Sequence, residues 1–415
     1  MPVSWFIIWI ISLASILCML LRPRGIAEAY WVCSGGVLLV LFRLIPVRQV
    51  AHAVYEGLDV YLFLAGMMIL AELAREEHVF DWIADVAAQH AENSPARLFT
   101  LVYLTGIVVT ALLSNDATAV VLTPAVLAVV RRARVQPKPY LLACALIANA
   151  ASFIFPISNP ANLVVFDQHM PPLMAWLSIF ILPSLVSVLV TFFCLRWICR
   201  KDLHGEFQGT LEPVSLSTEG KLALGGLLFA AIALIASSAL GLSLGAPTCA
   251  AAIVALVVVV WRDRSIVRRV ARGVSWSVLP LVAGLFVIVE ALQNAGLLRV
   301  GLSGLQALSR ASTQSAKLMA AFAVALLSNG MNNLPVGLMS GAAIRHANES
   351  GIVAHALLIG VDLGPNLSVT GSLATILWLI ALRRERVEIS AWEFFKVGMV
   401  AMPLALAGAL LALRG

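Results

Sequence analysis

Charged residues are scarce in this sequence of 415 residues: only 12% are Asp, Glu, Lys or Arg, while 61% are hydrophobic. A water-soluble domain of this size needs far more surface charge, so the composition excludes an ordinary soluble protein. The apolar residues also form long blocks, such as 3–21 and 244–261. A bilayer core of roughly 30 Å needs about 20 apolar residues per helix. Because backbone groups in lipid must be satisfied within their own helix, the sequence predicts an all-α polytopic membrane protein.

Further absences narrow the function. The six cysteines form no C-x-x-C pair, which argues against disulfides and a thiolate metal site. The basic residues do not gather in one patch, so nucleic acid is not an expected partner. No G-x-x-x-x-G-K-[ST] motif, His-x-x-x-His spacing or nucleophile–base pair occurs at span depth. We therefore expect no enzymatic activity, no cofactor and no bound metal.

The apolar blocks define ten predicted spans and two interrupted stretches. The spans are roughly 4–21, 28–45, 56–74, 139–166, 175–195, 222–241, 246–261, 274–294, 352–380 and 397–413. The stretches 98–130 and 318–344 are apolar but broken by polar residues, and we expect re-entrant hairpins there. The segment 79–91 has an amphipathic period, which predicts a helix on the lipid surface.

The Lys and Arg residues are distributed unevenly between the two sides of this topology. One set of connections holds 21 of the 28, and the other holds 7. The positive-inside rule places the richer set in the cytoplasm. Both termini then face the periplasm, the first hairpin enters from the cytoplasm, and the second enters from outside.

The two halves of the chain resemble each other. Ala65-Gly66 recurs as Ala283-Gly284, and ALLSND (111–116) recurs as ALLSNG (325–330) at nearly the same offset. Each half holds five spans and a hairpin, so the second half must insert upside down. We expect an N-terminal repeat over 1–198, a cytoplasmic linker over 199–221 and a C-terminal repeat over 222–415. Inverted repeats with interrupted helices are typical of secondary transporters.

Four polar clusters interrupt the apolar sequence, one in each hairpin and one in each of the spans 139–166 and 352–380. Unwound backbone at this depth is tolerated where it lines a cavity. The clusters are rich in Asn, Ser and Thr and contain no Arg or Lys, which favours a neutral polyhydroxy solute over a strongly charged anion. The predicted substrate-binding residues are Ser114, Asn115, Thr118, Ser158, Asn159, Asn162, Asn329, Asn332, Asn333, Asn366, Ser372 and Thr375.

Two carboxylates lie within these clusters. An uncompensated charge at the depth of Asp116 or Asp362 costs about 2.5–3.5 kcal/mol, so such a group tends to pair, to become protonated or to face water. We expect Asp116 and Asp362 to carry the coupled proton, with capping of helix ends as the alternative. Glu72 and Glu290, which occupy matching positions at span ends, are expected at the membrane interface.

The sequences SNDATAVVLTP, MNNLPVGL and especially VDLGPNLSVTGSLATILW resemble the ArsB-type arsenite and antimonite efflux permeases of the ion transporter superfamily. The resemblance covers nearly the whole chain. It implies a bacterial or archaeal inner-membrane protein that exchanges arsenite or antimonite for protons, with an ArsA-type ATPase subunit attached in some members. By motif it assigns function to Asn115, Asp116, Asn332, Asn333, Asp362 and Thr375.

Two alternatives stay open. The first is sodium-coupled transport of a dicarboxylate or inorganic anion. Related superfamily members of that kind carry Ser-Asn-Thr at both hairpins, whereas the third positions here are Asp116 and Gly330. The second is a membrane enzyme or scaffold without transport activity. Arsenite is an uncharged trihydroxide at neutral pH, which suits clusters that lack cations.

Overall fold

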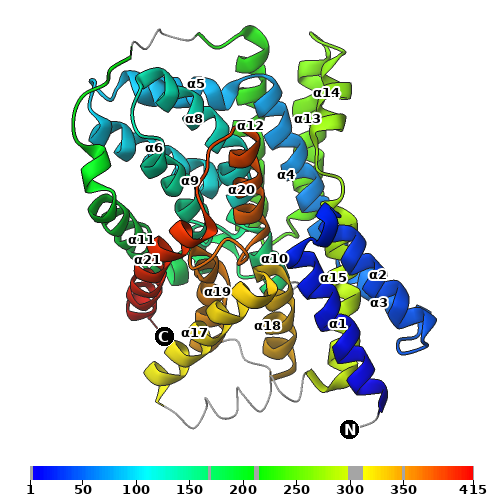
Figure 1. Ribbon diagram of the computed structural model, residues 1–415. Helices are drawn as coiled ribbons and strands as arrows, with labels where there is room; N and C mark the ends of the chain where they lie inside the picture. The colour runs from blue at the N-terminus through cyan, green and yellow to red at the C-terminus, as the bar shows by residue number, and fades with distance from the viewer. Residues whose placement is uncertain (1–2, 167–169, 210–214, 298–311, 348–350, 415) are drawn as a thin grey trace.

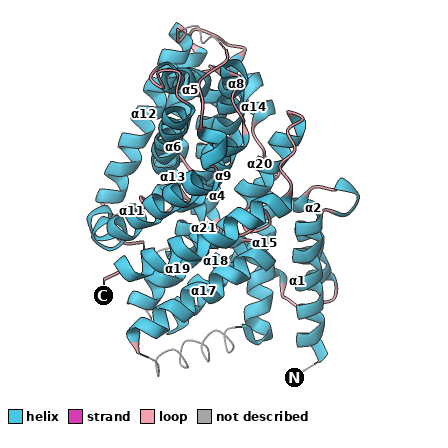
Figure 2. Ribbon diagram, turned by 60° about the vertical axis from the view of Figure 1, so that its left-hand side comes forward, coloured by secondary structure: helices cyan, strands magenta, loops and turns pink. Residues whose placement is uncertain are grey.

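The computed structural model describes residues 3–166, 170–209, 215–297, 312–347 and 351–414, and within these ranges the chain forms helices and loops without a strand (Figures 1 and 2). The helices before residue 210 are α1 (Val3–Leu21), α2 (Glu28–Leu41), α3 (Val47–Glu56), α4 (Leu58–Glu76), α5 (Val79–Gln89), α6 (Pro95–Leu112), α7 (Asn115–Ala117), α8 (Thr123–Ala133), α9 (Lys138–Ala150), α10 (Pro160–Phe166) and α11 (Leu173–Ile198). The later ones are α12 (Thr218–Ala239), α13 (Gly245–Val260), α14 (Ile266–Gly273), α15 (Val278–Leu292), α17 (Thr313–Met331), α18 (Asn333–Ala347), α19 (Ile352–Leu363), α20 (Leu373–Arg384) and α21 (Ala391–Ala412).

Six helical stretches of the described chain are long and apolar enough to cross a bilayer, and α3 with α4, bent by 48°, makes a seventh. The prediction of a multi-span helical membrane protein is confirmed. Six of the ten predicted spans coincide with these helices. The spans 28–45 and 246–261 form helices of only 14 and 16 residues. The spans 139–166 and 352–380 are interrupted near the middle, where Pro156, Pro160 and Pro365 lack the N–H that a continuing helix needs.

The first predicted hairpin contains a helix that is itself long enough to span. α6 has 18 residues and begins before the predicted boundary, because Ser94 caps it and Pro95 occupies its first turn. The Ser94 hydroxyl accepts a hydrogen bond from the backbone N–H of Arg97. That the chain over 98–130 returns to its side of entry stays a prediction.

The order of the helices repeats along the chain. α1, α2, α4, α6 and α11 have α12, α13, α15, α17 and α21 in the corresponding places. Their contacts repeat too: α4 packs along α13 as α15 packs along α2, and α6 packs on α9 as α17 packs on α19. When each helix in these contacts is replaced by its counterpart from the other half of the sequence, the same set of contacts results. Two related halves would produce such a pattern, while the inverted orientation and the boundaries 1–198, 199–221 and 222–415 stay predictions.

The glycines of the sequence repeat lie where these helices cross. A Cβ on Gly66 would stand 2.7 Å from the backbone carbon of Thr248 in α13. A Cβ on Gly284 would stand 2.8 Å from the Val32 side chain in α2. Both distances are shorter than real Cβ contacts, so each glycine lets two helices approach closely, as small residues do in membranes.

Substituting Gly66 by Ala should lower the thermal stability of the detergent-purified protein. The added methyl group meets backbone rather than a flexible side chain, and overpacking of this kind costs about 1–3 kcal/mol. The matched control is Gly225→Ala in α12, where a Cβ meets nothing within 4 Å. The midpoint of thermal unfolding of Gly225→Ala should equal or exceed that of the wild type, because Ala has a higher helix propensity than Gly. Equal midpoints for wild type and Gly66→Ala would contradict the close crossing.

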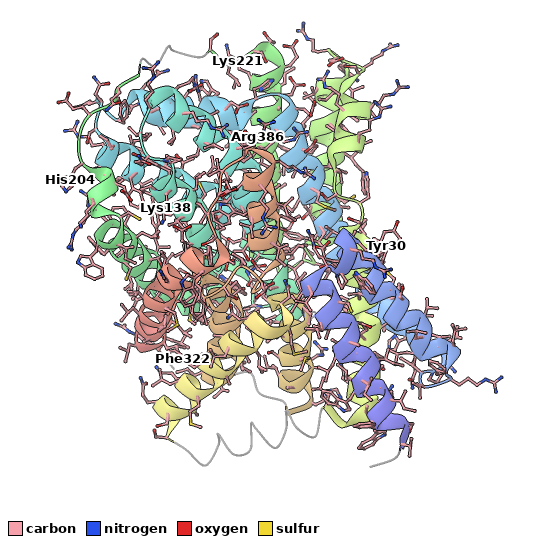
Figure 3. The ribbon with its side chains drawn as sticks, viewed as in Figure 1. Tyr30, Lys138, His204, Lys221, Phe322 and Arg386 are labelled. Atoms are coloured by element: carbon pink, nitrogen blue, oxygen red, sulfur yellow. The ribbon has the colours of Figure 1, made fainter. Side chains whose placement is uncertain are left out.

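The two chain ends lie toward the opposite end of the molecule from Lys221 and Arg386. Both ends of the described chain are in the lower half of Figure 1. Figure 3, in the same view, places Lys221 and Arg386 in the upper half. The sequence assigns these two residues to the cytoplasmic side, and this assignment stays a prediction.

Candidate functional site

Four helices begin around one small pocket. α7 begins at Asn115, α10 at Pro160, α18 at Asn333 and α20 at Leu373. Residues at all four starts line a narrow pocket with a cavity volume of about 10 Å³, which we call the inner pocket. Its lining consists of Leu64, Asn115, Asp116, Asn159, Pro160, Val278, Asn333, Leu334, Ser372, Leu373 and Ala374. The four polar breaks of the sequence therefore meet in space.

The local sequence explains two of these helix starts through capping hydroxyls. The Ser114 hydroxyl accepts a hydrogen bond from the backbone N–H of Ala117 at 3.2 Å. The Ser372 hydroxyl accepts one from the backbone N–H of Thr375 at 3.1 Å, and the Thr375 hydroxyl in turn accepts one from the Ser372 N–H, which completes a capping box. Both serines have extended backbone, so the chain enters each helix at a sharp angle.

The other two starts depend on a proline and an asparagine. Pro160 has no backbone N–H to leave unpaired and occupies the first position of α10. Asn332 has φ +77° and ψ +151°, a strained backbone conformation that residues other than glycine rarely adopt. Its side-chain oxygen accepts a hydrogen bond from the backbone N–H of Leu334 at 3.3 Å. The backbone N–H of Asn333 donates to the carbonyl of Gly371 at 2.8 Å, which joins the second hairpin to the break before α20.

The second hairpin breaks at Asn332, inside the predicted polar cluster 328–333 but one helical turn later than the ALLSN match suggests. The ALLSN match aligned Ser328 with Ser114, but Ser328 still belongs to α17 and donates to the carbonyl of Val324 at 2.9 Å. No proline or extended residue interrupts α17 before Asn332. The helices α7 and α18 begin at Asn115 and Asn333. The sequence distance between these two residues equals that between Gly66 and Gly284, and it differs from the distance between the two ALLSN peptides. The counterpart of Asp116 is therefore Leu334, not Gly330.

Two buried side-chain hydrogen bonds tie the interrupted spans together. Asn159 Nδ2 donates to Asp362 Oδ1 at 2.8 Å, and Asn149 Nδ2 donates to Asn366 Oδ1 at 3.0 Å. Asp362 and Asn366 are both 0% exposed. Asn366 also donates to the carbonyl of Leu146 at 3.0 Å. Each bond joins the first half of the sequence to the second, so the α9–α10 segment and the α19–α20 segment form one linked unit.

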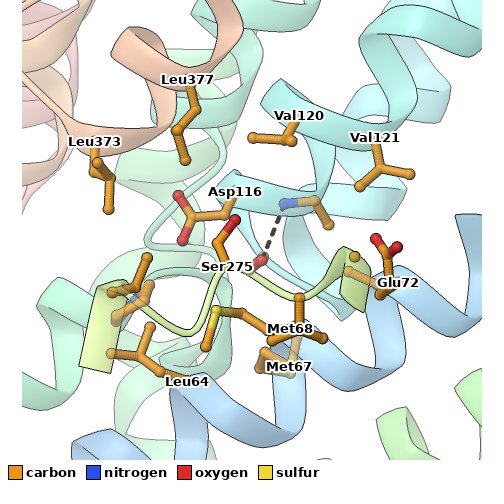
Figure 4. A pocket seen from close by; sticks show the side chains of 17 residues that line it. Leu64, Met67, Met68, Glu72, Asp116, Val120, Val121, Ser275, Leu373 and Leu377 are labelled. Carbon is orange, nitrogen blue, oxygen red and sulfur yellow. Dashed lines mark hydrogen bonds between the residues drawn. The ribbon is translucent and has the colours of Figure 1, made fainter. Parts of the chain in front are cut away.

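Asp116 faces a larger space that adjoins the inner pocket. This space, the access pocket, has a cavity volume of about 100 Å³ and shares Leu64, Asp116, Pro160, Val278 and Leu373 with the inner pocket. Figure 4 shows the Asp116 carboxylate directed into it, with Ser275 nearby and Glu72 farther along the wall. Asp362 lines neither pocket. Of the two predicted proton carriers, Asp116 therefore borders open space and Asp362 does not.

Glu72 lies in this wall rather than at an exposed interface. It is 7% exposed, and the Arg75 guanidinium holds its carboxylate with an Nε–Oε2 distance of 2.9 Å. A Cβ on Gly273 would overlap the Glu72 carboxylate, so a larger residue there would require the Glu72 side chain to move. Glu290 lines a separate, smaller pocket of about 20 Å³ with Val60, Leu163 and Arg345. The paired glutamates thus belong to two different pockets.

The predicted binding residues divide into two groups. Ser114, Asn115, Asn159, Asn333 and Ser372 line the inner or the access pocket, as does Asp116. The others line neither pocket; they are Thr118, Ser158, Asn162, Asn329, Asn332, Asn366 and Thr375.

Residues of the second group hold the breaks in shape. Ser158 donates to the carbonyl of Ala111, and Asn162 donates to that of Ser152 at 2.9 Å. Thr118 shares a hydrogen bond with Thr110 at 2.8 Å, and Asn329 donates to the carbonyl of Gly364 at 2.9 Å. These hydrogen bonds fix the backbone around the pocket, although the residues that make them do not line it. Substrate binding by any of the predicted residues stays a prediction.

The sequence reasoning did not single out several lining residues. Ser275 lies in the turn between α14 and α15, which was expected at the start of a continuous span. Met67 and Met68 lie on α4, where they read as ordinary apolar residues of a span. In the sequence, the one feature that pointed to this wall of the access pocket was the recurrence of Glu72 as Glu290 in the second half.

The electrostatic character of the pocket follows from its helix ends. The start of a helix carries a partial positive charge and free N–H groups, so four starts together attract oxygen atoms and negative charge. Asp116 occupies the first turn of the helix that begins at α7 and already places a carboxylate there. Of the described residues that line the two pockets, none is Lys, Arg or Cys. The two pockets together therefore present amides and hydroxyls beside the carboxylates of Asp116 and Glu72. In the part of the chain that the structure describes, no three His, Cys, Asp or Glu side chains are grouped to hold a metal.

Comparisons with known proteins identify related chains. The family model described as "Citrate transporter" matches residues 6–363. The arsenical pump membrane protein of Escherichia coli K12 is 27% identical over 406 residues, which covers 94% of each chain. That of Yersinia enterocolitica is 27% identical over 395 residues and covers 91% of each. A putative arsenical pump membrane protein of Bacillus subtilis is 24% identical over 415 residues, covering 92% of this chain and 93% of that one.

A solved structure shares the fold. The YdaH transporter of Alcanivorax borkumensis superimposes with a TM-score of 0.59 at 14% sequence identity, covering 88% of this chain and 86% of that chain. At this identity the likeness concerns the fold alone. It extends over most of the helices described above.

Proposed function

The chain is a multi-pass membrane transporter that belongs to the citrate transporter family and is related to arsenical pump membrane proteins, and we propose that it expels arsenite or antimonite from the cytoplasm in exchange for protons. One observation supports this most directly: Asp116, the carboxylate at the meeting of four helix starts, borders the access pocket as well as the inner pocket. A group in that position can exchange protons with water and meet a small solute in the same space.

The lining suits a neutral hydroxide. Arsenite and antimonite present hydroxyl groups and no net charge at neutral pH. The side-chain amides of Asn115 and Asn333 offer both donors and acceptors to such hydroxyl groups. Release is also favoured, because a site built from weak neutral hydrogen bonds binds loosely enough for transport.

Asp116 and Asp362 receive different roles in this proposal. Asp116 carries the proton, since it reaches the pocket. Asp362 is a positioning residue, since it is fully buried and its Oδ1 accepts the hydrogen bond of Asn159, the residue before Pro160. Asn159 in turn accepts a hydrogen bond from the backbone N–H of Ala161 at 3.0 Å. Asp362 thereby fixes the start of α10.

We place the access pocket on the cytoplasmic side, with both termini in the periplasm. The wall that contains Glu72 lies beside Arg75 and Arg269, which the positive-inside rule assigns to the cytoplasm. Two inverted halves of ten spans and two hairpins would then alternate this opening with one on the other side. The pocket of Glu290 occupies the corresponding place in the second half.

A second candidate is transport of an anion such as citrate. The family description and the four converging helix starts favour it. A dicarboxylate, however, would meet the Asp116 carboxylate without a Lys or Arg in the described lining to offset the repulsion. We therefore rank arsenite and antimonite first.

Uptake into everted membrane vesicles tests the proposal. With a proton gradient imposed, vesicles that contain the protein should accumulate labelled arsenite, and an ionophore that collapses the gradient should abolish the uptake. Sodium-driven accumulation of labelled citrate, without any of arsenite, would establish the anion transporter instead.

Replacing all six cysteines by Ala or Ser should leave substantial arsenite transport. Trivalent arsenic binds thiolates tightly, but no cysteine of the described chain lines either pocket. The measurement is the initial rate of uptake in the same vesicles, normalised to the amount of protein. Complete loss of uptake that one restored cysteine reverses would show that a thiol takes part.

A further inference from the structure

The access pocket contains two sulfur atoms that the proposed function does not yet use. α4 turns one face toward this pocket, and that face carries Leu64, Met67, Met68 and Glu72 at helical spacing. Met67 is 4% exposed, and Met68 is half-buried. Figure 4 shows both methionines on α4, on the side of the pocket across from Leu373 and Leu377.

The position of the two methionines places them on the route to the inner pocket. Glu72 lies toward the end of α4 that bears Arg75, and Leu64 borders both pockets. Met67 and Met68 lie between these residues on the helix. A solute that moves along this face from Glu72 to Asp116 therefore passes the two thioethers.

The corresponding place in the other half has no sulfur. At the offset shared by the paired glycines and the paired glutamates, Met67 and Met68 correspond to Leu285 and Phe286. Phe286 lines the pocket of Glu290, whose lining in the described chain includes no Met or Cys. The thioethers are thus a feature of one side of the molecule rather than of the repeat.

Thioethers have a chemistry that distinguishes metalloid hydroxides. Sulfur is a soft donor that favours soft, polarisable centres, whereas hydroxyl and amide oxygens do not make this distinction. Trivalent arsenic and antimony are soft centres, and antimony is the more polarisable. Boric acid is also a neutral trihydroxide, but its centre is hard. A thioether is uncharged and binds more weakly than a thiolate, so it allows release.

From this placement we propose that Met67 and Met68 contact the metalloid atom in the access pocket and make the transporter selective for antimonite and arsenite over hard neutral hydroxides. This inference rests on the proposed function and adds a basis for selectivity to it. The flexible, unbranched side chains can adjust to either centre. No covalent step is involved.

The transport test uses a cysteine-free background and the double variant Met67→Leu/Met68→Leu, which keeps the apolar volume. The antimonite concentration for half-maximal uptake should rise by about tenfold, the factor that roughly 1.4 kcal/mol of binding free energy carries. The rise for arsenite should be smaller. Boric acid should then compete against either metalloid more effectively than it does against the wild type. Adding Leu64→Met to the double variant returns one thioether to the same wall and should restore part of the preference.

Two further measurements make the test decisive. Met402→Leu on α21, a buried methionine outside both pockets, is the matched control and should leave uptake unchanged. X-ray absorption at the arsenic edge, recorded on purified cysteine-free protein loaded with arsenite, should show sulfur scatterers that the double variant lacks. Oxygen scatterers alone in the cysteine-free protein, or equal half-saturation and boric acid competition in both proteins, would overturn the inference. Failure of the wild type to transport either metalloid would instead refute the proposed function.

Discussion

The Asp116→Asn variant should lose proton-driven arsenite transport while it keeps the fold. The amide has nearly the same shape and fills the same place at the first turn of the helix, but it cannot take up and release a proton. Removing a positioned proton-transfer group typically costs roughly 100-fold or more in rate. We therefore expect everted vesicles with this variant to show uptake close to that of empty vesicles under an imposed gradient.

Two controls define the meaning of this result. Asp202→Asn, an exposed carboxylate in the turn after α11, should transport like the wild type. Exchange of labelled arsenite across vesicles without a gradient should survive in Asp116→Asn, because the lining stays polar. Full gradient-driven uptake by Asp116→Asn would remove this residue from the coupling mechanism.

The second large effect concerns Asp362, where the choice of substitution decides the outcome. Asp362→Leu removes the acceptor for Asn159 and leaves a buried amide donor unpaired, which costs about 1–3 kcal/mol. The start of α10 then loses its anchor. We expect a lower midpoint of thermal unfolding in detergent and at least a tenfold slower uptake, the factor that roughly 1.4 kcal/mol carries.

Asp362→Asn should be far milder. Its side-chain oxygen still accepts the hydrogen bond of Asn159, so gradient-driven uptake should remain within a few-fold of the wild type, a difference of about 1 kcal/mol or less. Loss of proton coupling in Asp362→Asn, with Asp116→Asn unaffected, would reverse the roles that we assign to the two carboxylates.

The interruptions of the helices could be predicted because their causes are local. Pro156 and Pro160 cannot donate helical hydrogen bonds, and Gly364-Pro365 stops α19 within an apolar sequence. That the polar clusters belong together followed from the cost of leaving them in lipid. The structure brings all four to one pocket.

The register of the second hairpin could not be predicted from the residues. The identical ALLSN peptides suggested equivalent positions, yet the second copy stays helical until Asn332. A serine in an apolar helix can bond to its own backbone, as Ser328 does, or begin a new helix, as Ser114 does. Tertiary contacts decide between these states.

The access pocket was missed for a different reason. Met67, Met68 and Glu72 lie on a regular helix, and a hydrophobic pattern does not tell which face of a buried helix borders a cavity. Ser275 belongs to a break between α14 and α15 without a proline. Only the packing of α4 against α14 and α15 reveals this wall.

The two amide bridges, from Asn159 to Asp362 and from Asn149 to Asn366, have a consequence for how the molecule changes shape. Because each one is enclosed away from water, parting its ends would expose a costly unpaired dipole to hydrocarbon. If the molecule alternates its openings, we expect the interrupted spans of the early and late sequence to move as a single body against α4 and α15. A bound solute would then leave the α4 side chains while it keeps its neighbours on that body.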